Sequence, residues 1–351
     1  MFWPVFILLF CVIRAEISLK NMYNLYKELE NKVVIITGGA GYIGSSLINE
    51  LGKYSVKKII RTSRKIQKPL KGVEDWNLDL NFLSSWLRIV EESDIIFHLS
   101  GNTSIPVAEN DPEGILASEI SPITNLVRAS KELFQTPRVI YASTATVYGL
   151  TEELPVSESY VPVPITSYDI HKLQVEKQLE IASQENIINA ISLRLANVYG
   201  PSSSESSSSD RGILSKITKL CFENKTISLY GSGSYVRDYV YIDDVVNAFL
   251  LAGIVNYDEI YKVSEFSLNV SSEKGTYVKK AFDLIAQEVK KFTGVNSNIK
   301  NTSWPSRASE IEKRNFIGSS ERLKSMTNWT AQTSVEDGVQ SLVKYHSKEY
   351  R

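Results

Sequence analysis

The chain contains few of the residues that build metal sites and disulfide frameworks. Its 351 residues include two cysteines, Cys11 and Cys221, and three histidines, His98, His171 and His346. Two cysteines form neither a disulfide framework nor a cysteine zinc site, and the histidines lie too far apart in sequence to show metal-ligand spacing. We therefore predict that the protein binds no metal and resides in a reducing compartment, the cytoplasm.

A surplus of one charge is also absent, because 39 lysines and arginines stand against 40 aspartates and glutamates. A nucleic-acid-binding surface or an acidic interaction tail leaves such a surplus in the composition. We therefore predict that the protein has no nucleic-acid partner.

The apolar run at the N-terminus, residues 1–13, is too short to cross a bilayer, which takes roughly 20 residues. It also lacks the basic start of a signal peptide. We predict no stable transmembrane span. Three interpretations stay open: a weakly membrane-associating segment over residues 2–13, a helix that docks on the core, or sequence upstream of the true start. We expect residues before about Tyr23 to be dispensable for the fold.

What the sequence does contain is a glycine-rich turn between a predicted strand and a predicted helix. The segment Val33–Gly44 has the sequence VVIITGGAGYIG, and residues 45–51 after it are typical of a helix. In a dinucleotide-binding fold, Gly38 permits the sharp turn, Gly41 lets the backbone approach a pyrophosphate, and Gly44 lets the helix lie close to the strand. The helix N-terminus then offers N–H groups to the phosphates.

The second predicted strand ends near Arg61, where an NAD-binding fold normally places an acid against the ribose 2′-hydroxyl. This chain has the segment Arg61–Lys65 there, without an acid. Arg61 and Arg64 suit the 2′-phosphate of NADP, so we predict NADP slightly ahead of NAD. The alternative is that both arginines are solvated surface charges. After a third short strand, Asp79 and Leu80 are predicted to contact the adenine.

A tyrosine and a lysine at helical spacing form a further motif. A predicted strand over residues 138–142 leads into Ser143–Gly149, and one loop later Tyr168 and Lys172 open a helix on a shared face. A neighbouring ammonium and a positive nicotinamide lower the pKa of a tyrosine, so Tyr168 is predicted to act as general base or acid near neutral pH. Thr144 would hydrogen-bond the substrate oxygen that exchanges its proton with Tyr168. Such a Tyr–Lys pair also occurs by chance on surface helices, but its position after the Ser–Thr strand end favours function.

Alternating strands and helices in the rest of the chain predict an α/β protein with a doubly wound parallel sheet. A fourth strand, residues 94–100, ends in small residues that let the backbone run beside the cofactor, so Leu99, Ser100 and Gly101 are predicted cofactor contacts. His98 is predicted to pack within this strand. The further predicted elements are helices over 118–134, 212–223, 245–254, 277–292 and 335–345, and strands over 191–195 and 261–263.

Together these motifs resemble the extended short-chain dehydrogenase/reductase family, in its nucleotide-sugar epimerase/dehydratase branch, over about residues 32–345. The resemblance implies a Rossmann NAD(P)-binding domain over 32–200, after an N-terminal extension of residues 1–31. It implies a smaller C-terminal α/β substrate-binding region over 201–351, of which about 236–264 return to the first domain. The motifs that carry it are Thr37–Gly44, Ser143–Gly149, Tyr168 with Lys172, Asn197–Pro201 and Arg237–Asp244.

The resemblance also implies site residues. Thr144, Tyr168 and Lys172 would form the catalytic group, and Tyr168 and Lys172 would also contact the cofactor, together with Tyr42 and Ile43. A homodimer is expected from the resemblance as well.

On the substrate side, the resemblance implies that Asn197 contacts a nucleoside-diphosphate sugar and that Arg237 binds its diphosphate. Arg307 resembles the second diphosphate arginine of the family, with Glu310 in the place of an acid near the nucleotide. Thr103 is expected in a loop that shapes the substrate site.

The chain departs from the dehydratases of this branch, which carry Thr-Asp-Glu where this chain has Ser143-Thr144-Ala145. Without the Asp-Glu pair, there is no acid and base to remove water from the sugar. We therefore expect an epimerase that oxidises and reduces C4 of a nucleoside-diphosphate hexose, similar to UDP-glucose 4-epimerase, in surface-polysaccharide sugar synthesis. One alternative is an NADPH-dependent reductase of 4-keto-6-deoxyhexoses, supported by Arg61 and Arg64. The second is a non-catalytic NADP-binding protein.

Overall fold

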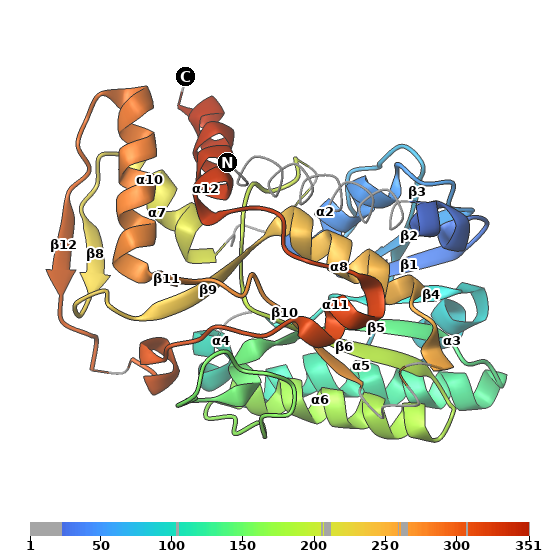
Figure 1. Cartoon of the computed structure of the whole chain (residues 1–351). Helices are drawn as coiled ribbons and strands as arrows, with labels where there is room; N and C mark the ends of the chain where they lie inside the picture. Colours follow the sequence, from blue (N-terminus) through green and yellow to red (C-terminus); the bar gives the residue numbers. More distant parts are fainter. Residues whose placement is uncertain are drawn as a thin grey trace, which may run out of the picture.

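A parallel sheet forms the centre of the computed structural model, which describes residues 23–102, 105–204, 206, 212–258, 260, 266–306 and 308–350. Within these residues the sheet has seven strands, in the order β10-β6-β5-β4-β1-β2-β3, and Figure 1 shows it on the right of the molecule. This arrangement confirms the predicted fold class. The strands are β1 (Val33–Thr37), β2 (Lys58–Ser63), β3 (Val73–Asn77), β4 (Ile95–His98), β5 (Arg138–Thr144), β6 (Asn189–Leu195) and β10 (Ser267–Val270).

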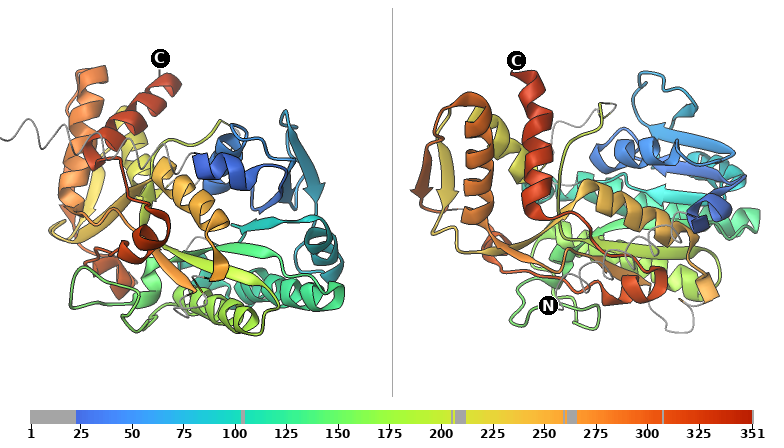
Figure 2. Two further views of the ribbon diagram at one scale, coloured as in Figure 1. Left: turned by 45° about the vertical axis from the view of Figure 1, so that its right-hand side comes forward. Right: turned by 45° about the horizontal axis from the view of Figure 1, so that its top comes forward.

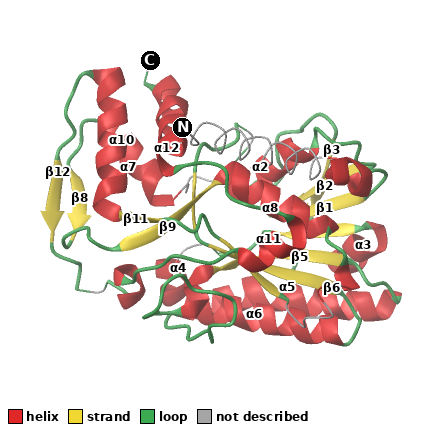
Figure 3. Ribbon diagram, in the orientation of Figure 1, coloured by secondary structure: helices red, strands yellow, loops and turns green. Residues whose placement is uncertain are grey.

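Helices cover both faces of this sheet, so its central strands are buried on both sides and consist largely of apolar residues. In β1, Val34 and Ile36 pack with helices α2 and α8, whereas Val33 and Ile35 point to the opposite face, against α3, α5 and α6. Figure 3 shows the two helical layers above and below the strands. The helices are α2 (Tyr42–Leu51), α3 (Leu83–Glu92), α5 (Pro112–Leu133), α6 (Ser167–Gln184) and α8 (Ile242–Ile254).

The second half of the chain adds a smaller layer beside the carboxyl ends of the main strands, as the two views of Figure 2 show. In the described residues it contains a three-stranded sheet, β11-β9-β7, and a two-stranded sheet, β12-β8. Helices α7, α10 and α12 pack against one another in this layer. Its elements are β7 (Asn197–Tyr199), α7 (Gly212–Phe222), β8 (Ile227–Tyr230), β9 (Val236–Tyr241), β11 (Gly275–Tyr277), α10 (Val278–Thr293), β12 (Ile299–Thr302) and α12 (Val335–His346). Two short helices pack on the main sheet and its helices instead: α4 (Ile105–Asn110) contacts α5 and α6, and α11 (Glu321–Thr327) contacts β10 and α8.

Helix α5 begins six residues earlier than the sequence pattern predicted, at Pro112 rather than at Ser118. Asp111 caps it, because its side chain accepts a hydrogen bond of 3.0 Å from the N–H of Gly114. Proline in the first turn costs no backbone hydrogen bond. The cap and the proline, rather than the first apolar repeat, therefore set the start of this helix.

The late strand also differs from the prediction. The observed last strand of the main sheet, β10, pairs in parallel with β6 over Ser267–Val270, whereas the predicted strand 261–263 lies outside the described residues. The N-terminal apolar run, residues 1–13, lies outside them too. None of the helices among the described residues combines the length and apolarity that a bilayer span requires.

Candidate active site

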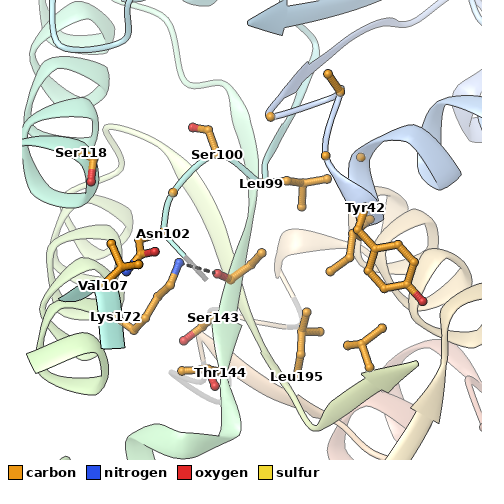
Figure 4. Close-up of a pocket in the computed structure, with 18 of the residues that line it drawn as sticks. Tyr42, Leu99, Ser100, Asn102, Val107, Ser118, Ser143, Thr144, Lys172 and Leu195 are labelled. Atoms are coloured by element: carbon orange, nitrogen blue, oxygen red, sulfur yellow. Dashed lines mark hydrogen bonds between the residues drawn. The ribbon is translucent and has the colours of Figure 1, made fainter. Parts of the chain in front are cut away.

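A cavity of about 920 Å³ opens at the carboxyl ends of β1, β4, β5 and β6, which is where open parallel sheets bind their ligands. The second layer closes it from the other side with residues of β7, α7 and β9. Figure 4 shows the cavity, with Tyr42, Leu99 and Leu195 facing Lys172 and Asn102 across it. Residues from both halves of the chain thus line one space.

The glycine turn after β1 forms one end of this cavity. Gly38 has a φ of +67°, and a Cβ there would lie 2.7 Å from the backbone nitrogen of Ser100. A Cβ on Gly44 would lie 2.5 Å from the carbonyl oxygen of Gly38, so only glycine lets α2 approach the strand this closely. Helix α2 starts at Tyr42 without a side-chain cap. A dinucleotide pyrophosphate fits this arrangement, because the glycine turn and the first turn of α2 line the cavity.

The predicted cofactor residues, with one exception, lie in the cavity wall. The predicted cofactor residues that line it are Gly38, Gly41, Tyr42, Ile43, Gly44, Arg64, Asp79, Leu80, Leu99, Ser100, Gly101, Tyr168 and Lys172.

The exception is Arg61, which does not line the cavity, and its predicted role is therefore corrected. Its side chain is 2% exposed, and its guanidinium donates to both carboxylate oxygens of Asp75, at 2.5 and 2.9 Å. A further 2.9 Å bond goes to the carbonyl of Lys68. Asp75 stands directly opposite Arg61 on β3. This acid on the neighbouring strand occupies the guanidinium, and only Arg64 of the predicted pair reaches the cavity.

Helix α6 brings Tyr168 and Lys172 into the cavity wall beside Thr144, which ends β5. The ammonium of Lys172 is buried and donates a 3.2 Å hydrogen bond to the carbonyl of Ala142, drawn as a dashed line in Figure 4. It lies 5.9 Å from the centre of the Tyr168 ring. The structure thus brings together the three residues that the motifs suggested.

The electrostatics of this group differ from the expectation in one respect. Burial raises the pKa of Tyr168 above its ordinary value, and Lys172 opposes this rise without reversing it, because Glu119 and Asp169 add to the rise. The lysine acts in the predicted direction, but the net shift of the Tyr168 pKa is upward. The positive charge of Lys172 alone therefore does not make Tyr168 a base at neutral pH.

Thr144 belongs to a chain of polar side chains that leads away from the cavity. Its hydroxyl lies 2.9 Å from the hydroxyl of Thr146, which donates a short hydrogen bond to the carboxylate of Asp169. The other oxygen of Asp169 accepts a 2.6 Å bond from Thr166, the N-cap residue of α6. Since Thr146 donates its proton to Asp169, it can only accept from Thr144. This chain fixes the Thr144 hydroxyl next to the reacting position.

On the substrate side, Asn197 lines the cavity, and its side-chain oxygen is buried without a hydrogen-bond partner. Buried polar atoms are nearly always paired, so this oxygen is suited to a ligand. Arg237 does not line the cavity. Its guanidinium donates instead to the backbone carbonyls of Glu312 and Arg314. Glu310 does not line it either and pairs with Lys313 at 2.5 Å, and Thr103 and Arg307 lie outside the described residues.

Sequence reasoning missed several residues of this site. Tyr239 and Val107 line the cavity, and Glu119 forms a buried ion pair with Lys172 at 3.2 Å. Asp169 stands next to Tyr168 in the sequence, which is the one signal that could have drawn attention to it. Glu119 gave no such signal, because it lies 53 residues before Lys172 in the sequence and meets it only in the folded chain. No group of three or more metal-ligating side chains occurs in the described part of the chain.

A parallel sheet with a glycine turn, and a Thr–Tyr–Lys group in the same cavity, define a short-chain dehydrogenase/reductase of the extended type. The chain belongs to the NAD dependent epimerase/dehydratase family, whose model matches residues 34–263.

Known relatives and structures agree with this membership. A UDP-glucose 4-epimerase of Lactobacillus helveticus is 24% identical over 89% of this chain and 96% of its own length. A UDP-glucuronic acid decarboxylase 1 of Danio rerio is 26% identical over 95% of this chain and 78% of its own length. The crystal structure of a Thermotoga maritima UDP-glucose 4-epimerase with UDP-glucose matches with a TM-score of 0.78 and 26% identity, over 91% of this chain and 100% of that one. Epimerases and decarboxylases both occur among the relatives.

Proposed function

We propose that the protein is an NAD-dependent nucleotide-sugar epimerase that inverts C4 of a nucleoside-diphosphate hexose. The observation that carries the proposal is the meeting of Thr144, Tyr168 and Lys172 with the glycine turn in one cavity. The family description and the UDP-glucose 4-epimerases among the relatives support the reaction type and the cofactor. A role in surface-polysaccharide sugar synthesis, a cytoplasmic location and a homodimer stay predictions.

The glycine turn and α2 would hold the dinucleotide, which when bound accepts and returns a hydride. Tyr168 would take the proton of the sugar 4-hydroxyl during oxidation and return it during reduction. Thr144 would lie beside the same hydroxyl, held in place by its hydrogen bond to Thr146. Lys172 would hold its charge beside the phenol. Asn197 would bind the sugar nucleotide through its unpartnered oxygen.

The choice of NAD follows from the corrected position of Arg61. With its guanidinium bound to Asp75, Arg61 no longer argues for a 2′-phosphate. Arg64 does line the cavity and is exposed. Because an arginine at the cavity wall suits the 2′-phosphate of NADPH, an NADPH-dependent 4-ketoreductase is the second candidate function.

The test is to incubate the purified protein with UDP-glucose, without added cofactor, and to follow the sugar by NMR. We expect UDP-galactose to appear up to an equilibrium mixture, with no product from a Tyr168→Phe variant. Oxidation of NADPH by a nucleotide-linked 4-keto-6-deoxyhexose, with no epimerisation, would support the reductase instead. Loss of carbon dioxide from UDP-glucuronic acid would support the decarboxylase reaction of the other relatives. Binding of dinucleotide without turnover of any sugar would leave the non-catalytic function.

A further inference from the structure

The buried carboxylate of Glu119 is the one acidic group in direct contact with Lys172 among the described residues. One of its oxygens lies 3.2 Å from the Lys172 ammonium, and the two side chains are 2% and 6% exposed. The same oxygen lies 3.4 Å from the hydroxyl of Tyr141. The other oxygen accepts a 2.5 Å hydrogen bond from the backbone N–H of Asn102. Three donors therefore hold the carboxylate in a single position.

The backbone beside Glu119 is adapted to its presence. Gly101 has a φ of +150°, and a Cβ at this position would lie 2.4 Å from a Glu119 oxygen. Only glycine allows both this conformation and this approach. The Glu119–Lys172 contact is thus built into the loop that lines the cofactor side of the cavity.

An ion pair at this position changes what Lys172 can do. A lysine without a partner would present a full positive charge to Tyr168 and favour its phenolate. With Glu119 in contact, its negative charge offsets part of the effect of Lys172, because the two act on the Tyr168 pKa in opposite directions. Burial opposes the charged form of Lys172, but Glu119, Tyr141 and Tyr168 together raise the pKa of Lys172 overall. The lysine therefore stays protonated while its field at Tyr168 is reduced.

We propose that Glu119 is a positioning residue that offsets the charge of Lys172 at Tyr168 and thereby keeps Tyr168 protonated until a further positive charge enters the cavity. The inference rests on the proposed role of Tyr168 as general acid and base. The oxidised nicotinamide ring carries such a charge and its reduced form does not. Tyr168 would then be a base when a 4-hydroxyl is to be oxidised and an acid when a 4-keto sugar is to be reduced.

The other groups around Tyr168 and Lys172 do not replace Glu119 in this role. His98 on β4 is fully buried and neutral, because burial and Lys172 lower its pKa to about 3. Tyr141 on β5 stays protonated, since burial raises its pKa well above the ordinary value. Asp169 on α6 shares its carboxylate between Thr146 and Thr166. Glu119 is left as the carboxylate that faces Lys172 directly.

The test is a spectroscopic titration of Tyr168 in the whole protein, with any bound dinucleotide in its reduced form so that no positive nicotinamide is present. Phenolate absorbance is recorded against pH for the wild-type chain and for Tyr168→Phe, and the difference between the two curves reports Tyr168 alone. The same pair of curves is recorded in a Glu119→Gln background. We expect Glu119→Gln to lower the midpoint of Tyr168 by at least about one pH unit, a tenfold change in proton affinity.

The matched control is Glu109→Gln. Glu109 lies on α4, and its carboxylate accepts a 2.7 Å hydrogen bond from the N–H of Ser167 at the start of α6, the helix of Tyr168 and Lys172, but it does not contact Lys172. We expect this variant to leave the Tyr168 midpoint unchanged. An equal shift in both variants, or none in Glu119→Gln, overturns the proposal, because a purely structural role of Glu119 would not move the midpoint selectively.

Two further outcomes complete the test. If Glu119→Gln does not fold, the wild-type titration with reduced dinucleotide alone decides, since a Tyr168 midpoint well below the ordinary value of about 10 in the absence of a positive nicotinamide overturns the proposal. Failure of the proposed function is distinguishable, because the titration needs no substrate. A selective shift without any epimerisation of UDP-glucose would support the role of Glu119 and refute the reaction.

Discussion

Removal of Asp75 tests the corrected position of Arg61 most sharply. In Asp75→Ala, the Arg61 guanidinium loses both of its carboxylate bonds and keeps only the carbonyl of Lys68. Breaking a buried ion pair from one side costs about 3–5 kcal/mol. Because the Asp75 side chain is 29% exposed, water can replace part of the loss, and we expect about 3 kcal/mol, at the lower end of that range.

The control removes both partners. Arg61→Met/Asp75→Leu leaves no buried charge, and we expect a change in the free energy of unfolding within about 1 kcal/mol of the wild type. Equilibrium urea unfolding, followed by circular dichroism, measures all three proteins. Binding of NADH and NADPH to the double variant should keep the wild-type ratio. A selective loss of NADPH affinity in the double variant would refute the account, because it would mean that Arg61 reaches the cofactor.

The remaining predictions concern the site and the pH dependence of stability. Tyr168→Phe should lower turnover about 10²- to 10⁴-fold while dinucleotide binding, measured by calorimetry, stays unchanged; equal loss of both would point to a structural defect. Asn197→Ala should raise KM for the nucleotide sugar up to about tenfold, and an unchanged KM in steady-state assays would remove Asn197 from the site. Burial and the charge of Lys172 lower the pKa of His98 to about 3, whereas in the unfolded chain it is about 6.5. The contribution of neutral His98 to the free energy of unfolding is therefore fully present above pH 6.5 and is lost as the pH falls from there toward 3. Between pH 7 and pH 5 this loss is about 2 kcal/mol, so urea unfolding of His98→Gln should show a smaller pH dependence, and an identical one would contradict the assignment.

The parts of the fold and site that the sequence predicted correctly are those whose signals are local. The strand–glycine turn–helix of Val33–Gly44 depends on adjacent residues, since Gly38 and Gly44 satisfy constraints imposed within one turn. The spacing of Tyr168 and Lys172 likewise needs only the helix period. These features could be predicted because no distant part of the chain decides them.

The features that were missed depend on partners far apart in the sequence. Arg61 resembled a cofactor ligand because Asp75 reaches it only through pairing of β2 with β3. Glu119 approaches Lys172 from another helix, across the end of β5. Arg237 has the predicted motif around it, but the backbone carbonyls of Glu312 and Arg314 take its guanidinium. Tertiary contacts of this kind leave no periodicity or motif in the chain.

The most direct test of the central claim is to denature the purified protein and to identify any released dinucleotide by mass. The account predicts NAD in a stoichiometric amount that survives gel filtration, because an epimerase regenerates its cofactor within each turnover. Protein free of dinucleotide that takes up NADPH in preference to NADH would contradict the account. The cofactor would then be consumed and exchanged, as a reductase requires.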